Sequence, residues 1–451
     1  MTKAADTVRK TLVRHDLAAL LRLSWPVILS RLGIMTMGIT DAIVVGRYSP
    51  IELGYQALGW MPTGVVIMTG AGLLAGVQVI TARHIGEGRI EATGGVLRRG
   101  LIYSSWLGAG IGLGLFIFGP WLMNHVGLEP DLGRGSGLVL KVLAISLPFH
   151  LISTAATYYL EALSRPKPAT VAMWCCNIVN LAINLWLVPG HGAMPAMGAV
   201  GASWATVASR AVLSAWLLIY IARLPDVRTL GVFGKPIDGP QDAIDQRRVG
   251  YGGGASGFVE AFAFSSMNLV AGWLGGLAVA GWAVVLNMTA LIFMIPLGLS
   301  AATAVLVGRA YGAKDRAGLV RAANLGFGVC VAILTLVALG VMAFARTIAG
   351  FYSTDPALIE LAGGALMLGS LYFIFDGLQA VAAQALRARG DVLVPTLTHI
   401  VSYAFVMIPL AWVLAFPAGL GLPGVVWAVI IASLLSAGLL LARFWWLAKR
   451  L

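Results

Sequence analysis

The stretch AVAGWAVVLNMTALIFMIPLGLSAATAVLVG covers residues 278–308 and contains no Asp, Glu, Lys or Arg. A helix needs roughly 20 consecutive apolar residues to cross the hydrocarbon core of a bilayer. This run exceeds that length, and its few polar residues are uncharged. It therefore predicts a transmembrane helix, and it gives the pattern to search for in the rest of the chain.

Apolar runs of similar length recur on both sides of this one. Lipid-facing barrel strands alternate with a period of two residues, and these runs do not, so we interpret them as helices. They predict an all-α polytopic membrane protein with twelve transmembrane helices. The predicted helices are 24–46, 53–82, 94–120, 136–162, 169–189, 197–222, 249–273, 278–308, 319–345, 359–386, 394–415 and 421–446.

The composition excludes a soluble globular protein. Hydrophobic residues make up 59% of the 451 residues and charged residues only 11%, and the mean hydropathy is +0.87. Soluble domains usually carry about 25% charged residues. This chain has too little charge to cover a soluble surface of its size, so it belongs in a membrane.

The net charge of +12 is a signal of topology rather than of nucleic-acid binding. Of the 31 Lys and Arg residues, 25 fall before the first predicted helix, in alternate loops or at the C-terminus, and four fall on the other side. Cytoplasmic loops collect Lys and Arg. We therefore predict that both termini are cytoplasmic, and we expect no nucleic-acid partner. Arg31 and Arg210 lie within predicted helices, and the sequence gives no account of them.

The two halves of the chain repeat each other. At an offset of 226 residues Arg83 matches Arg309, and at an offset of 223 residues Trp204 matches Trp427. Such sustained matches predict two pseudo-symmetric six-helix bundles related by an axis along the membrane normal, an arrangement typical of transporters. The predicted domains are a cytoplasmic amphipathic N-terminal segment (1–23), an N-terminal six-helix lobe (24–223), a cytoplasmic linker (224–248) and a C-terminal six-helix lobe (249–451).

Three of the 19 acidic residues fall well inside predicted helices, namely Asp41, Glu260 and Asp376. A charged side chain at the centre of a membrane helix costs roughly 2.5–3.5 kcal/mol on insertion scales, and such residues are functional candidates by default. Protonation or a bound cation offsets that cost. We therefore predict that these acids couple transport to protons or sodium, with Na⁺ held at Glu260 and Asp376 if sodium is the ion.

Helical spacing places further side chains beside these acids. Aromatic and Met side chains next to a carboxylate suit a greasy organic cation. Amides inside a membrane helix must face the bundle interior, because lipid cannot satisfy them. The predicted supporting polar residues are Asn177, Asn180, Asn184, Tyr372 and Gln379, and the predicted substrate-binding residues are Phe264, Met267 and Tyr372.

Three stretches carry a resemblance to a known family, namely SWPVILSRLGIMTMGITDAIVVGR (24–47), LNMTALIFMIPLGLSAATAVLVGRAYGAKD (286–315) and FDGLQAVAAQALRARGD (375–391). Taken together, they resemble the multidrug and toxic compound extrusion (MATE) transporters, and the resemblance extends over nearly the whole chain. The acids Glu260 and Asp376 make the chain most similar to the NorM-like branch. Asn184 stands where an archaeal pattern of the family has Asp, and Arg31 where the family more often has a neutral residue.

The resemblance implies a V-shaped MATE fold and a non-enzymatic antiporter that exports cationic or amphipathic drugs and toxins for inward H⁺ or Na⁺, with protons favoured. It further implies a monomer in the bacterial inner membrane, among membrane lipids, with no cofactor. Two alternatives stay open. A lipid-linked oligosaccharide flippase of the same superfamily would need a cationic cavity, and Arg31 and Arg210 keep it under consideration. A polytopic lipid-modifying enzyme would need clustered His or acidic residues near one membrane face.

Overall fold

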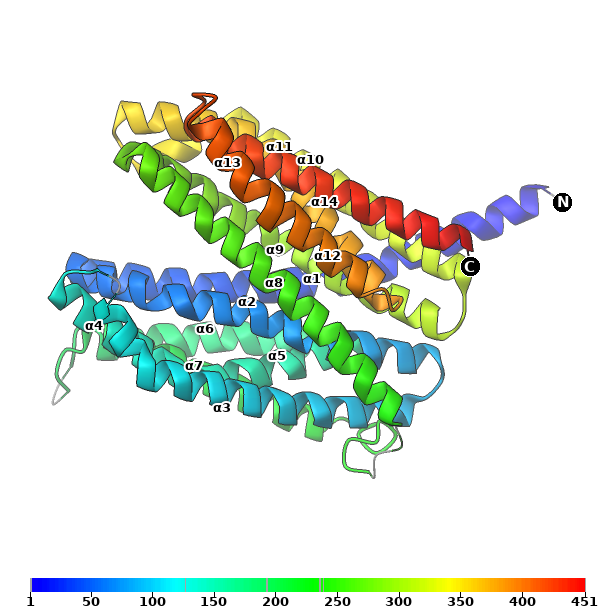
Figure 1. Cartoon of the computed structure of the whole chain (residues 1–451). Coiled ribbons are helices and arrows are strands. Elements are labelled where there is room, and N and C mark those ends of the chain that lie inside the picture. Colours follow the sequence, from blue (N-terminus) through cyan, green and yellow to red (C-terminus); the bar gives the residue numbers. More distant parts are fainter. Residues whose placement is uncertain (1, 126, 192–193, 235–236, 238, 451) are drawn as a thin grey trace. The chain divides into compact units, whose positions relative to one another are not determined.

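The computed structural model describes residues 2–125, 127–191, 194–234, 237 and 239–450, and within these ranges it is helical with no strand (Figure 1). The helices of the first half are α1 (Thr2–Tyr48), α2 (Pro50–Gly86), the 3-10 turn η1 (Ile90–Ala92), α3 (Thr93–His125), α4 (Pro130–Ile145), α5 (Leu147–Ala162), α6 (Lys167–Leu187) and α7 (Gly198–Ala222). Those of the second half are α8 (Pro240–Leu274), α9 (Gly276–Gly312), α10 (Arg316–Tyr352), α11 (Pro356–Ala388), α12 (Leu393–His399), the π segment η2 (Ile400–Met407), α13 (Ile408–Ala415) and α14 (Leu422–Arg450).

Each predicted apolar run is helical in the structure, which confirms the all-α fold. Among the described residues, ten helices are long and apolar enough to cross a membrane, and the pair α4 and α5 adds an eleventh span. The remaining predicted span, 249–273, lies in α8, a helix of 35 residues. Its glycine run and the polar residues of its first turns lower its mean hydropathy without interrupting the helix.

Two of the predicted helices are irregular, which the apolar pattern did not indicate. The run 136–162 is broken at Ser146, where α4 and α5 meet at an angle of 43°. Pro148 lies in the first turn of α5 and has no N–H to donate to the preceding turn. In the run 394–415, the π segment η2 ends at Met407, two residues before Pro409. Proline within a helix and π-bulges are recognised causes of such breaks.

The helices form two compact units, an N-terminal unit (residues 29–254) and a C-terminal unit (residues 1–28 and 255–451). Two helices contribute to both units, because α1 changes unit after Ile28 and α8 changes unit after Gly254. The boundaries of the units therefore lie inside helices. Residues 235, 236 and 238 of the predicted linker lie outside the described residues, and α8 begins within that linker, at Pro240.

The predicted amphipathic segment 1–23 is not separate from the first span. Apart from Met1, which lies outside the described residues, it forms the first turns of the continuous helix α1. Leu20 and Leu23 are buried. Asp16 accepts a hydrogen bond of 2.6 Å from Nε of Arg321 in α10, so an ion pair holds this segment to the rest of the C-terminal unit.

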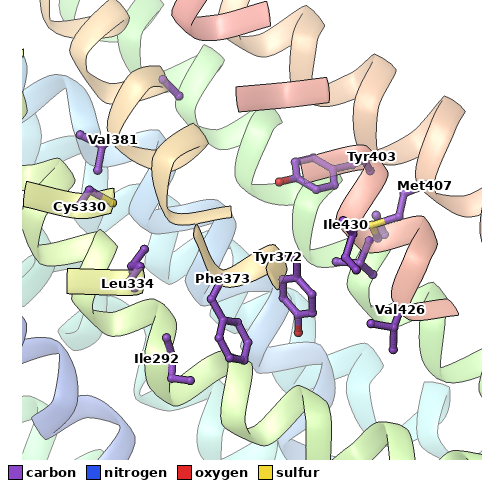
Figure 2. Packing of buried hydrophobic residues seen from close by; sticks show 14 of the residues in the cluster. Ile292, Cys330, Leu334, Tyr372, Phe373, Val381, Tyr403, Met407, Val426 and Ile430 are labelled. Atoms are coloured by element: carbon purple, nitrogen blue, oxygen red, sulfur yellow. The ribbon is translucent and has the colours of Figure 1, made fainter. Parts of the chain in front are cut away.

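The core of the C-terminal unit is one continuous cluster of buried side chains. Figure 2 shows part of it, with Tyr372 and Phe373 adjacent on α11 and with Tyr403 and Met407 on the π segment. Trp282 of α9 is fully buried in the same cluster. Because lipid tails are as apolar as these side chains, such helices associate through close packing and interhelical hydrogen bonds.

Glycines let α2 and the first part of α8 approach each other within the N-terminal unit. A Cβ added at Gly72 would lie 2.3 Å from the carbonyl oxygen of Gly253, and one added at Gly253 would lie 2.5 Å from the carbonyl oxygen of Gly72. Small residues at such crossings allow backbone contact between membrane helices. In the run YGGGASG (251–257), Gly253 and Gly254 therefore form the packing surface against α2.

We expect Gly253→Ala to destabilise the protein by about 1–3 kcal/mol, the usual cost of inserting atoms into a well-packed contact. The new Cβ would meet backbone atoms, which cannot move aside as a side chain can. Thermal unfolding in detergent measures the effect. Gly110→Ala in α3 is the matched control, because a Cβ there meets nothing within 4 Å. Equal unfolding temperatures for the two variants would contradict the close contact.

Candidate functional site

In the N-terminal unit, a group of neutral polar side chains surrounds Asp41. Asp41 lies on α1 and is 0% exposed. Asn184 of α6 donates from Nδ2 to its Oδ1 at 2.6 Å, and Thr206 of α7 donates from Oγ1 to its Oδ2 at 2.6 Å. Neither partner carries a charge. An ionised carboxylate held this way is costly in a dry interior, so the group is suited to bind and release a proton or a cation.

The three predicted amides of α6, Asn177, Asn180 and Asn184, contact two different parts of α1. Asn180 accepts from Asn184 at 3.2 Å, so both belong to the group around Asp41. Asn177 instead donates to the carbonyl oxygen of Gly33 at 3.0 Å. Asn180 and Asn184 therefore lie beside Asp41, whereas Asn177 contacts the backbone of α1.

In the C-terminal unit, Glu260 of α8 and Asp376 of α11 share one polar neighbour. Gln379 donates from Nε2 to Oε1 of Glu260 and to Oδ1 of Asp376, at 3.4 Å in each case. Tyr403 of the π segment donates its hydroxyl to the same Oδ1 of Asp376 at 3.1 Å. Asp376 is 2% exposed, whereas Glu260 is half-buried. Two acids from different helices are thus brought to a single amide.

The three predicted substrate-binding residues lie in different surroundings. Phe264 is half-buried, and its ring centroid lies 6.2 Å from that of Tyr403, which places it beside the carboxylate pair. Met267 and Tyr372 are each 0% exposed in the core. The hydroxyl of Tyr372 is hydrogen-bonded to Thr289 of α9.

Thr206, Tyr403 and Arg387 are site residues that the sequence did not identify. Arg387 of α11 is 6% exposed, and its positive charge attracts Glu260. It donates from Nη2 to the hydroxyl of Ser256 on α8 at 2.7 Å. In an apolar run a lone Thr or Tyr gives no signal, because its hydroxyl is also compatible with lipid-facing or packing roles. Arg387 lay near the end of a predicted helix, where basic residues are expected on topological grounds.

A fourth buried acid corrects the count of three intramembrane acids. Glu161, at the end of α5, is 2% exposed. Arg31 of α1 donates from Nη2 to its Oε1 at 3.1 Å, and Gln78 of α2 donates from Nε2 to its Oε2 at 2.6 Å. The Arg31 guanidinium also lies 5.3 Å from the ring centroid of Tyr158. This ion pair accounts for the unusual Arg31.

The other intrahelical arginine, Arg210 of α7, is 4% exposed. It donates from Nη1 to the hydroxyl of Ser146 at 2.7 Å, at the break between α4 and α5. Its guanidinium lies 5.2 Å from the ring centroid of Trp60. Arg210 therefore supports the broken span, and its positive charge also attracts Asp41. Among the described residues, no cluster of three or more His, Cys, Asp or Glu side chains is arranged to hold a metal ion.

Comparison with known proteins identifies the family. The MatE family model matches residues 26–186 and 255–413, one segment in each half of the chain. The chain belongs to the MatE family. A probable multidrug resistance protein NorM of Caulobacter vibrioides is 52% identical over 432 residues, covering 96% of this chain and 92% of that protein. The multidrug resistance protein PmpM of Pseudomonas aeruginosa is 31% identical over 446 residues, covering 95% and 91%.

Solved structures agree on the MatE fold. A crystal structure of a MATE protein in the bent conformation matches with a TM-score of 0.87 at 22% identity, and the match covers 98% of each chain. The prediction of a MATE-type membrane protein is thereby confirmed. Members of the MatE family are transporters and not enzymes, so this chain is a multi-pass transporter.

Proposed function

We propose that this chain is a secondary active antiporter that exports cationic or amphipathic organic molecules in exchange for inward-moving H⁺ or Na⁺. The multidrug resistance names of its relatives from Caulobacter and Pseudomonas support the drug-export part of the proposal. We place it in the bacterial inner membrane as a monomer without a cofactor. The distribution of Lys and Arg supports cytoplasmic termini.

One observation carries the proposal, namely that carboxylates buried in membrane helices are held by neutral donors. Thr206 and Asn184 hold Asp41, and Tyr403 and Gln379 hold Asp376. Hydrogen bonds from neutral donors compensate the charge of an ionised acid only in part, and at Asp41 the buried Arg210 adds an electrostatic attraction. A proton or a small cation removes that charge, so its arrival changes the free energy of the site. If the proton or cation binds one conformation of the protein with higher affinity than the other, its binding shifts the equilibrium towards that conformation.

We favour protons as the coupling ion, because a proton needs one carboxylate oxygen whereas Na⁺ needs several oxygen ligands. Asp41 has a single acid at its site. Glu260 and Asp376, with the carbonyl of Gln379 and the hydroxyl of Tyr403, are the alternative location for Na⁺. We propose that Phe264 contacts the organic cation through its ring face. Met267 and Tyr372 are fully buried in this structure and therefore not accessible to a substrate. Their role as substrate contacts stays a prediction.

The repeat between the two halves of the chain suits a transporter whose binding site opens to each side of the membrane in turn. We propose that the two lobes predicted at residues 24–223 and 249–451, joined by residues 224–248, rock about a site that binds ion or substrate in turn. A lipid-linked oligosaccharide flippase is less favoured, because Arg31, one of the two arginines that suggested a cationic cavity, is paired with Glu161.

Everted vesicles that contain the protein test the proposal. We expect an imposed proton gradient to drive accumulation of a fluorescent organic cation and a sodium gradient to have little effect. If sodium alone drives uptake, the ion is wrong and the antiport mechanism holds. If neither gradient moves the cation, while labelled lipid-linked oligosaccharide crosses the membrane, the flippase alternative replaces the proposal. Vesicles without the protein are the control.

A further inference from the structure

A cavity of about 270 Å³ lies within the N-terminal unit, between α2, α3 and the first turns of α8. It takes no part in the carboxylate sites described above. Its lining contains guanidinium groups, an amide and aromatic rings together with aliphatic side chains. The residues that matter for its chemistry are Arg99, Tyr103, Trp106, Gln246, Arg247 and Tyr251.

The polar end of the cavity concentrates positive charge. Arg99 donates from Nε to Oε1 of Gln246 at 3.0 Å, and Gln246 donates to the carbonyl oxygen of Val96 at 3.1 Å, which ties α8 to α3. Arg247 and Arg98 are near enough to Arg99 for their like charges to repel it. Asp242 attracts Arg99 more strongly than either of these arginines repels it, and the same carboxylate also forms an ion pair with Arg89 at 3.0 Å.

The other end of the cavity is built for hydrocarbon. Leu73, Leu74 and Val77 of α2 form an apolar wall. At the mouth, Trp106 is 77% exposed and Tyr251 is 57% exposed. Amphipathic rings collect at the level of lipid headgroups. The cavity also lies near the helix ends and loops that collect Lys and Arg, where anionic headgroups are attracted to basic residues.

We propose that this cavity binds an anionic phospholipid, with the phosphate between Arg99 and Arg247 and an acyl chain along the apolar wall. An anion at this point relieves the repulsion among the arginines. The apolar wall and the exposed indole of Trp106 favour a lipid over a free phosphate, because a free phosphate has no hydrocarbon part to contact them. The bound lipid thereby stabilises the contact between the first turns of α8 and α3. The helix α8 continues beyond Gly254 into the C-terminal unit.

Tryptophan quenching tests the proposal on the full-length protein in phosphatidylcholine bilayers. Brominated phosphatidylglycerol is added as the probe, and unlabelled lipids compete with it. The part of the quenching that disappears in Trp106→Phe reports this cavity. We expect phosphatidylglycerol to compete for this signal, and phosphatidylcholine and inorganic phosphate not to compete.

The arginines are tested one at a time. Near an anionic surface each Lys or Arg contributes about 1 kcal/mol, so we expect Arg247→Gln to weaken competition by phosphatidylglycerol about fivefold. Arg247 is exposed, so its replacement should not unfold the protein. Arg247→Lys should retain most of the affinity. Arg134→Gln is the matched control, because Arg134 lies outside the cavity in an exposed ion pair with Asp131.

Three results would overturn the proposal. Equal competition by phosphatidylglycerol and phosphatidylcholine would show a site without charge preference. Competition by inorganic phosphate would show a general anion site. Unchanged affinity in both Arg247→Gln and Arg99→Gln, with Arg99→Gln folded by its unfolding temperature, would show that the arginines bind no headgroup.

Discussion

Asp376→Asn is expected to lower gradient-driven export by roughly 5- to 150-fold, the range that coupling free energies of 1–3 kcal/mol produce. Asparagine keeps the size of the side chain, and its Oδ1 can still accept the hydroxyl of Tyr403. What it loses is the ability to bind or release a proton. The ion then no longer distinguishes two states of this site, and a ligand without differential affinity shifts no equilibrium.

The measurement is the initial rate of organic-cation uptake into everted vesicles after the gradient is imposed. Binding of the cation without a gradient is measured in parallel and should change much less. Asp355→Asn is the matched control, because Asp355 caps the first turn of the same helix by accepting from the N–H of Ala357 at 3.0 Å. Asparagine also caps helices well, so this variant should transport normally.

Asp41→Asn and Glu260→Gln extend the same prediction to the other acids. In Asp41→Asn the amide oxygen can accept from Asn184, and the amide nitrogen can donate to the hydroxyl of Thr206 after that hydroxyl rotates. Packing is kept and the charge is lost. If all three neutral variants pump as well as the wild type, the carboxylates do not couple the ion to transport.

Arg31→Met alone and Glu161→Gln alone are each expected to destabilise the protein by about 3–5 kcal/mol, the usual result of removing one partner of a buried ion pair. The first variant leaves the buried carboxylate with Gln78 as its remaining partner, and the second leaves the guanidinium without a counter-charge. The side chains of Arg31 and Glu161 are only 14% and 3% exposed, so water compensates neither.

The double variant Arg31→Met, Glu161→Gln should regain most of the lost stability. Both charges are then absent, and the carbonyl oxygen of the introduced amide can still accept from Gln78. Thermal unfolding of the four proteins in detergent gives the interaction free energy. Arg134→Met is the control, because its ion pair with Asp131 is 70% and 83% exposed, and exposed pairs contribute about 0–1 kcal/mol. Additive losses in the double variant would mean that Arg31 and Glu161 stabilise the fold separately.

The places where sequence interpretation fell short have a common cause. Glu161 lay at the end of a predicted span, and a carboxylate there is compatible with the membrane surface. Only its contacts with Arg31 and Gln78, which come from α1 and α2, show that it is buried. Similarly, nothing in the apolar run 394–415 marks Tyr403 as the donor to Asp376, because that hydrogen bond depends on where the fold places η2 relative to α11.

The sequence by itself determined the class of protein, the twelve spans and the presence of acids inside them. These properties are local. The length and hydropathy of each segment decide whether it can cross the bilayer, and a helix makes all its backbone hydrogen bonds within one segment. The tertiary structure alone decided which side chains meet. Arg31 and Glu161 are 130 residues apart in the chain, and Asp41 and Asn184 are 143 apart. Such pairings follow from packing between helices, which no single segment encodes.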